Sequence, residues 1–404
     1  MLIFLQYIVK NDNKGEHEML KIILIAAALI GTLGLPLHAQ GTQADAKEYA
    51  AQATSYNGIG LVYYNQGNYA KALEYHNKAL AVFLKVLGEN HPNTARSYNN
   101  IGLVYEKQGN YAQALEFYNK ALVILLKVKG ENHPNTATCY NNIGGVYDSQ
   151  GNYAKALEYH NKALVVRLKV LGENHPDTAT SYNNIGLVYD NQGNYANALE
   201  FYNKALVILL KVKGENHPDI ATSYYNIGGV YDSQGNYAKA LEFYNKALVI
   251  RLKVLGENHP DTATSYNNIG AVYDSQGNYA QALEFYNKAL AVFLKVLGEN
   301  HPSTATSYNN IGMVYGKQGN YAKALEFFNK ALAIDLKVKG ENHPDTAASH
   351  YNIGGMLYCS GKKTEARDHL RKAAAIARKT LGPDHPYTKQ ISEGLQFVEN
   401  ELSK

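Results

Sequence analysis

Cysteine is scarce in this chain: it occurs twice in 404 residues, at Cys139 and Cys359, and no CxxC pair is present. Cysteine-paired zinc sites and disulfide-built folds are therefore excluded. Charge is also sparse, with 18% charged residues and a net charge of +4 that is spread along the chain rather than gathered into a run. The basic stripe typical of nucleic-acid-binding proteins is missing, so no nucleic-acid partner is expected.

Motifs that carry chemistry are absent as well. No phosphate-binding GxxxxGK[ST] loop, HExxH or GxSxG occurs. Catalysis requires dissimilar groups that converge on one point, and near-identical repeats do not supply them. We therefore expect no catalytic residue, no cofactor and no resident metal.

What the chain has instead is a 42-residue unit that recurs along most of its length. Ala95–Thr136, ARSYNNIGLVYEKQGNYAQALEFYNKALVILLKVKGENHPNT, is one copy. The glycine of its QG or SG pair recurs eight times at this period, at Gly67, Gly109, Gly151, Gly193, Gly235, Gly277, Gly319 and Gly361. A short unit repeated at a fixed period predicts a solenoid, because each copy must bury its apolar side against its neighbours.

Each unit is predicted to form two helices. On a helical wheel, Tyr98–Gln108 divides into a packing side and a mostly polar side, and Gly109 breaks the helix. A second helix of about 18 residues follows; its apolar positions are Tyr111, Ala114, Leu115, Tyr118, Ala121, Leu122, Leu125 and Leu126. Gly130 suits its C-cap, and Pro134 suits the first turn of the next unit.

The spacing of large and small residues within the unit resembles the tetratricopeptide repeat (TPR) pattern. The residues that carry the resemblance are Tyr98, Ile101, Gly102, Tyr105, Ala114, Tyr118 and Ala121. The usual TPR unit has 34 residues and a proline that closes the second helix, whereas this unit has 42 residues and Leu126 at that place. The longer unit with its GENHP connector is similar to the repeats of kinesin light chains and nephrocystin-type proteins. The resemblance implies an all-α, right-handed superhelical solenoid of eight TPR units over residues 44–385.

The two ends of the chain differ from the repeats. At the C-terminus, Tyr387, Ile391, Leu395, Val398 and Leu402 form one stripe, which predicts a capping helix over residues 386–404 that covers the last apolar face.

At the N-terminus, residues 19–39 have the composition of a secretory signal peptide. A lysine precedes the apolar run 22–33, and a small-residue region ends at Ala39. The run is shorter than the roughly 20 residues of a membrane span, so no stable span is expected after cleavage. Residues 1–18 form an unassigned extension, most simply explained by translation that starts at Met19. Export from a bacterial-type cell, to the periplasm or the medium, is expected; the alternatives are a cytoplasmic or an N-terminally anchored protein.

Eight histidines, His91, His133, His175, His217, His259, His301, His343 and His385, occur in the connectors. Neighbouring helix axes lie about 8–10 Å apart, whereas a metal–nitrogen bond is about 2 Å, so one ion does not reach two of them. We expect each histidine to cap the helix that follows. Cys139 and Cys359 lie five repeats apart, too far for a disulfide, and are expected to be free and mostly buried thiols.

The polar side of the first helix carries the candidate site, because this side faces the concave groove in TPR arrays. Stacked repeats align its asparagines in two rows, here called the first row (Asn57, Asn99, Asn141, Asn183, Asn267 and Asn309) and the second row (Asn100, Asn142, Asn184, Asn226, Asn268, Asn310 and Asn352). An acidic row runs beside them (Glu106, Asp148, Asp190, Asp232 and Asp274). An amide both donates and accepts, so the asparagines could pair with the backbone of an extended peptide, while the acids would favour a ligand with Lys or Arg.

Two other interpretations remain open. The asparagines could instead bond between neighbouring helices and hold the pitch of the array. The protein as a whole could be a structural element that self-associates through its ends or convex face. The expected function is a non-enzymatic protein-interaction scaffold, with self-assembly as the alternative.

Overall fold

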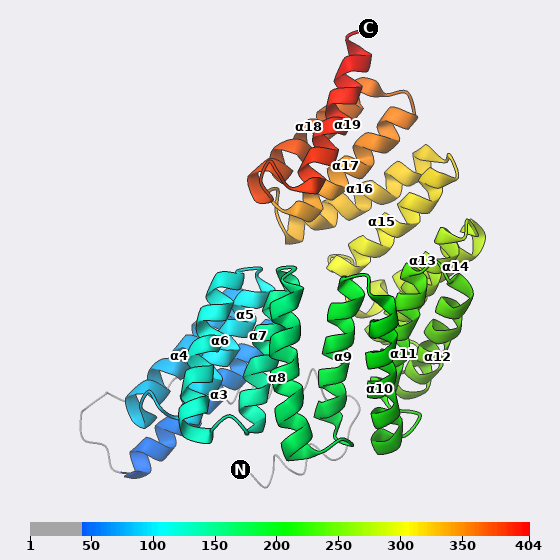
Figure 1. Cartoon of the computed structure of the whole chain (residues 1–404). Helices are drawn as coiled ribbons and strands as arrows, with labels where there is room; N and C mark the ends of the chain where they lie inside the picture. The colour runs from blue at the N-terminus through cyan, green and yellow to red at the C-terminus, as the bar shows by residue number, and fades with distance from the viewer. Residues whose placement is uncertain (1–42) are drawn as a thin grey trace. The chain divides into compact units, whose positions relative to one another are not determined.

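The computed structural model of the chain describes residues 43–404, and each regular element in that range is an α-helix (Figure 1). The helices are α3 Gln43–Asn65, α4 Tyr69–Leu87, α5 Pro92–Lys107, α6 Tyr111–Lys129, α7 Pro134–Ser149, α8 Tyr153–Leu171, α9 Pro176–Asn191, α10 Tyr195–Lys213, α11 Pro218–Ser233, α12 Tyr237–Leu255, α13 Pro260–Ser275, α14 Tyr279–Val296, α15 Pro302–Lys317, α16 Tyr321–Val338, α17 Pro344–Cys359, α18 Lys363–Thr380 and α19 Pro386–Leu402. The extension 1–18 and the signal segment 19–39 lie outside the described residues.

The helices form pairs that repeat along the chain. Odd-numbered helices from α3 to α17 are the first helix of each repeat, here called helix A, and even-numbered helices are helix B. The chain forms two compact units, one that ends at Asn194 and one that begins at Tyr195. Within each unit consecutive helices pack on one another, most extensively helix A on helix B of the same repeat. This arrangement confirms the predicted all-α solenoid of helix pairs.

The helix ends follow the connector sequence. The Nδ1 atom of His91 accepts the backbone N–H of Asn93 at 3.1 Å, and Pro92 occupies the first turn. The same cap occurs at all eight connector histidines, so their expected capping role is confirmed. Gly130 ends α6 with φ of 80°, a backbone conformation that glycine adopts without strain.

The core of each repeat is built from small residues against one large side chain, which is an aromatic or histidine ring in all repeats but the eighth, where it is Leu370. In the second repeat, Ala114, Tyr118 and Ala121 of α6 are fully buried. Gly102 of α5 lies so close to Tyr118 that a Cβ atom there would be 2.7 Å from the ring. The small and large positions of the TPR-like pattern are therefore the positions where the two helices touch.

Two burial predictions are wrong. Leu126, expected in the apolar stripe of helix B, is 38% exposed, because the stripe is wider than the surface that the adjacent helices cover. Cys139 is buried, but Cys359 is exposed because it is the last residue of α17; both thiols are free.

Helix α19 closes the C-terminal end of the array. Ile391 and Val398 are buried against α17 and α18, and Tyr387 and Leu395 pack partly against the same clusters. Leu402, expected in the stripe, is 38% exposed at the end of the helix. The apolar face of the eighth helix pair is thus covered by α19.

Candidate functional site

The asparagine rows lie on helices A, where half-buried side chains alternate with buried apolar ones. Asn57 is buried, and its Nδ2 atom donates to Ser97 Oγ of the next helix A at 2.9 Å, so at this position the expected groove role is wrong. The other twelve asparagines of the two rows are half-buried. Ile101 and Val104, which follow the row positions on α5, are fully buried. The buried positions attach helix A to its neighbours, so the amides lie at the margin of the core.

Several row asparagines bond to the next repeat. The Nδ2 atom of a second-row residue donates to the Oδ1 atom of the first-row residue one repeat earlier: Asn142 to Asn99 at 3.0 Å, Asn184 to Asn141 at 2.6 Å, and Asn310 to Asn267 at 3.1 Å. These contacts show that inter-helix bonding, the alternative interpretation of the rows, occurs at three places. Each bond uses one donor of one amide and one lone pair of the other, so capacity remains on both.

Other row residues have no such partner. The Nδ2 atom of Asn268 is buried without a hydrogen bond, because Tyr225 stands where the preceding repeat would supply a first-row asparagine. The Oδ1 atom of Asn309 is likewise buried and unpartnered. Buried polar groups are nearly always hydrogen-bonded, so these two atoms are exceptions to the pairing seen elsewhere in the rows.

The acidic row is partly used by the chain itself. Glu106 accepts a hydrogen bond of 2.6 Å from the hydroxyl of Tyr118. Asp148 accepts from Asn191 of the next repeat at 3.1 and 3.0 Å. Asp274 forms a 2.8 Å ion pair with Lys317 of the next repeat.

Burial also shifts the pKa values of acids in the acidic row. Desolvation raises the pKa of Glu106, Asp148, Asp190 and Asp232 above the ordinary value for their type. At Glu106 the hydrogen bond from the Tyr118 hydroxyl opposes this shift. The row therefore carries less readily ionised carboxyl groups than an exposed acidic surface would.

A cavity of about 240 Å³ lies beside the first-row asparagine of the second repeat. It is bounded by α5, α6 and α7, and its lining includes Arg96, Asn99, Leu125, Asn135 and Cys139. Burial raises the pKa of the Cys139 thiol to about 12, so this sulfur is not a reactive thiolate. The cavity carries one cationic side chain and no carboxylate.

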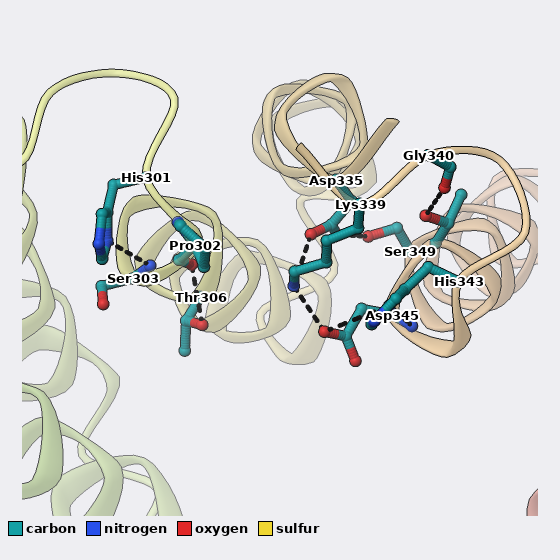
Figure 2. Close-up of polar contacts among 11 residues, drawn as sticks. His301, Pro302, Ser303, Thr306, Asp335, Lys339, Gly340, His343, Asp345 and Ser349 are labelled. Atoms are coloured by element: carbon teal, nitrogen blue, oxygen red, sulfur yellow. Dashed lines mark hydrogen bonds and ion pairs between the residues drawn. The ribbon is translucent and has the colours of Figure 1, made fainter. Parts of the chain in front are cut away.

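A second cavity of about 180 Å³, here called the α15–α17 cavity, occupies the equivalent place five repeats later. It is lined by Thr306 and Asn309 of α15, by Asp335 and Lys339 at the end of α16, and by Asp345 of α17. Figure 2 shows Lys339 between the two aspartates, with Asp335 deeper and Asp345 outside. Leu125 and Asn135 of the first cavity correspond to Asp335 and Asp345, so the two cavities differ in charge.

The contacts around Asp335 are specific. Its side chain is 2% exposed; one oxygen accepts from Ser349 Oγ at 2.8 Å and the other from Lys339 Nζ at 3.1 Å. Lys339 also donates to Asp345 at 2.5 Å. A buried carboxylate needs such partners, because desolvation of an unpaired charge is costly.

The sequence prediction missed this position. The equivalent helix-B residue is apolar in five repeats, Arg167 and Arg251 in two others, and Asp335 in one. Both arginines are buried. The signal was present in the sequence: a charged residue replaces an apolar one in otherwise near-identical copies.

Among the described residues, no group of three His, Cys, Asp or Glu side chains is placed to hold a metal ion. None of the described helices is both long and apolar enough to cross a membrane.

The repeat geometry agrees with a family model for the tetratricopeptide repeat, which matches residues 49–127, 102–169, 149–210, 177–253, 219–295, 275–337, 303–379 and 345–395. The chain belongs to the tetratricopeptide repeat family. TPR arrays are scaffolds that typically mediate protein–protein interaction and are generally not enzymes. A search of curated proteins found no match.

Several solved structures are similar to this chain. The apo form of RapI is 20% identical, with a TM-score of 0.52 and coverage of 71% of this chain and 99% of that chain. BtubC from P. vanneervenii is 23% identical, with a TM-score of 0.48 and coverage of 58% and 92%. A Podosopora anserina protein described as a kinesin light chain with nearly identical TPR-like repeats is 25% identical, with a TM-score of 0.45 and coverage of 51% and 98%. Kinesin-light-chain-like TPR proteins, which the 42-residue unit resembles, are thus among the similar structures.

Proposed function

We propose that the chain is a non-enzymatic scaffold whose helix-A face binds an extended peptide segment of a partner protein. The observation that carries this proposal is a cavity beside a first-row asparagine in each compact unit, next to Asn99 in one and Asn309 in the other. Cavities at the same register of the repeat could each receive a side chain, while nearby amides bond to the peptide backbone.

The second row supports the same function where its amides are not used internally. Asn100 and Asn226 are half-buried and make no side-chain hydrogen bond within the described part of the chain. Asn268 has an unpartnered Nδ2 atom. A rigid array that presents such groups in advance loses little conformational entropy on binding.

We also propose that the acidic row favours peptides with Lys or Arg. Asp190 and Asp232 are half-buried acids on helices A of successive repeats. Their raised pKa values mean that a cationic ligand would stabilise the ionised form and bind more tightly as the pH rises through these values.

The test uses peptides selected by display on the immobilised full chain. We expect Asn226→Ala with Asn268→Ala to weaken the selected peptides at least about tenfold, since each removes a hydrogen-bonding amide. The matched control is Asn245→Ala with Asn287→Ala, which changes helix B of the same two repeats, where both asparagines bond to their own helix. Fluorescence anisotropy gives the affinities and circular dichroism the melting temperatures. Wild-type affinity in the helix-A variant, or an equal loss in the control, would refute the proposal.

Self-association is a second candidate function, which exposed valines on helices B favour. Val123, Val165, Val207 and Val249 occupy one position of successive repeats and are 66%, 62%, 65% and 64% exposed. Sedimentation velocity over a range of concentrations tests it: Val165→Asp should abolish any oligomer. An oligomer that persists in this variant argues against the valine surface.

We propose in addition that the protein is exported, on the composition of residues 19–39. N-terminal sequencing of material from the cell envelope or medium should begin at Gln40. An intact N-terminus on cytoplasmic protein would contradict export.

A further inference from the structure

The α15–α17 cavity has an excess of negative charge. Asp335 and Asp345 contribute two carboxylates and Lys339 one ammonium group, which leaves one uncompensated negative charge among its lining residues. Asp335 is satisfied by Lys339 and Ser349. Asp345 is 56% exposed, so the uncompensated charge lies at the outer side of the cavity.

The cavity also has more acceptors than donors. The hydroxyl of Thr306 donates to the Pro302 carbonyl at 3.2 Å, so its own oxygen is left as an acceptor. Asn309 also lines the cavity. Lys339 already directs donors to both aspartates. A ligand group that carries several N–H donors and a positive charge complements this lining.

The chain itself provides a precedent for a cation at the equivalent place. Arg251, at the position of Asp335 two repeats earlier, donates from one guanidinium nitrogen to Ser265 Oγ at 2.7 Å and to the Asp261 carbonyl at 3.0 Å. Arg167, which lies two repeats before Arg251, makes the equivalent pair of contacts. The space between helix B and the next helix A therefore accommodates a guanidinium group in those two repeats, and at the equivalent place Asp335 presents a carboxylate that is bonded to Lys339 and Ser349.

We propose that the α15–α17 cavity is a specificity site that receives one cationic side chain of the bound peptide, arginine in preference to lysine. This inference rests on the proposed function, since the peptide delivers the side chain. The planar guanidinium can direct separate N–H groups to Asp345 and to the hydroxyl oxygen of Thr306, whereas an ammonium group is a compact point charge. The volume of about 180 Å³ is below that of pockets for drug-sized ligands and suits a single side chain. The equivalent cavity of the second repeat, with Arg96 and without a carboxylate, does not accept such a group.

The test uses small probes that require no peptide. The full chain is labelled with ¹³C at alanine methyl groups, and Ala305 and Ala348, which line the cavity, serve as reporters. N-acetyl-arginine methylamide should shift both signals saturably, and the neutral citrulline analogue should bind at least about tenfold more weakly. Equal binding of the two probes, or no shift at these methyl groups, would overturn the proposal.

The chain offers matched variants. Asp335→Leu with Asp345→Asn reproduces the residues Leu125 and Asn135 of the first cavity and should abolish the arginine-dependent shift. Asp345→Asn alone changes a half-exposed residue and should weaken binding without lowering the melting temperature, which covers the case of a double variant that does not fold. The control Asp261→Asn removes the same cap-position aspartate two repeats earlier and should bind as wild type. Retained binding in Asp345→Asn, or an equal loss in the control, would refute the assignment.

The two proposals fail in different ways. If the arginine probe binds but no selected peptide depends on Asn226 and Asn268, the cationic site is supported and the proposal that the helix-A asparagines bind a peptide is refuted. If selected peptides depend on those asparagines but arginine-to-citrulline changes in the peptide leave the affinity unaltered, peptide binding by the helix-A asparagines is supported and the cationic site is refuted.

Discussion

At the residue scale, one contact between a glycine and a large side chain recurs inside the helix pairs. A Cβ atom on Gly102 would be 2.7 Å from Tyr118, and one on Gly228 would be 2.8 Å from Tyr244. These distances are shorter than real Cβ contacts, and the rings are held in the core, so the two helices could accept a larger residue only by moving apart. The glycine thus sets the distance between helix A and helix B.

Replacement of this glycine should destabilise the fold. We expect Gly102→Ala to cost about 1–3 kcal/mol through overpacking against Tyr118. The matched control is Gly58→Ala, also on a helix A, where nothing lies within 4 Å of the added Cβ atom; it should stabilise by about 0.5–1 kcal/mol, because alanine favours the helix. Chemical denaturation followed by circular dichroism measures both. A destabilised Gly58→Ala with an unaffected Gly102→Ala would contradict this explanation.

Some repeats place a histidine where others have the tyrosine. His160 is 3% exposed, and burial, assisted by the nearby charge of Arg167, lowers its pKa from 6.5 to about 4. The unfolded chain therefore binds this proton more readily between these pH values. Stability from the neutral imidazole is complete above pH 6.5 and is lost as the pH falls towards 4, by at most about 3 kcal/mol.

The variant His160→Tyr should remove this part of the acid sensitivity. Tyr118 occupies the same position against Gly102, so tyrosine fits the core of this repeat pattern. We expect the melting temperature of the variant to decline less than that of the wild type between pH 6.5 and 4. Differential scanning calorimetry at several pH values measures the difference, and parallel declines would show that His160 is not an acid-sensitive group.

At the scale of the element, the helix-B position of Leu125, Arg251 and Asp335 decides how one repeat meets the next. Leu125 and Asp335 each border a cavity, one with apolar atoms and the other with a carboxylate at this position, whereas arginine spans the contact with hydrogen bonds to the following helix A. The cation of Arg251 is also 5.3 Å from the ring centre of Tyr225. Desolvation lowers the pKa of this arginine, which reflects the cost of its burial.

Replacement of Arg251 by a large apolar residue should affect stability differently from its truncation to alanine. We expect Arg251→Leu to keep or raise the melting temperature, because leucine is the native residue at Leu125 and well-packed apolar replacements of buried ions are often neutral or stabilising. Arg251→Ala should instead cost about 2–5 kcal/mol, since it leaves a cavity and removes the hydrogen bonds to Ser265 Oγ and to the Asp261 carbonyl. Thermal unfolding distinguishes the two, and a strong loss with leucine would show that the guanidinium contacts dominate.

At the scale of the whole molecule, stability is the sum of contacts between neighbouring helices. Consecutive helices within each unit pack on one another, and contacts between non-neighbours are few. In such an array each repeat contributes its own stability and one interface. A deletion or insertion should therefore preserve the fold only when it removes or adds whole 42-residue periods.

Deletion of residues 237–278 should be tolerated, because it removes one period and joins α11 to α14 with the same connection that α11 has to α12. We expect a folded protein with proportionally less helical circular dichroism. Deletion of residues 237–259 instead removes helix B alone and joins α11 to α13, both helices A, so their apolar faces lose their partner and the protein should aggregate or unfold. A folded product from the second deletion would contradict the nearest-neighbour description.

Much of the architecture was predictable from local patterns. The glycine period, the proline after each connector and the TPR-like spacing predicted the helix pairs, and the connector histidines proved to be N-caps. The predictions that concerned exposure at the ends of helices were wrong for Leu126, Cys359 and Leu402, since exposure there depends on how far the neighbouring helix extends.

Less of the candidate site than of the fold could be predicted from the sequence. The rows were predictable because residues at the same repeat position align when repeats stack. Which amides pair was not, because Asn142 bonds to Asn99 while Asn268 has lost its partner to Tyr225. The cavity beside Asn309 depends on how the side chains of α15, α16 and α17 pack against one another.

By itself, the sequence determined that this protein is a TPR array of eight helix pairs with a C-terminal cap, because that outcome depends on short-range periodicity and on capping and turn residues. Only the tertiary structure decided which polar groups satisfy one another and where space remains between repeats. Those properties depend on the sum of side-chain volumes and on hydrogen bonds 43 residues apart, such as that between Asn99 and Asn142.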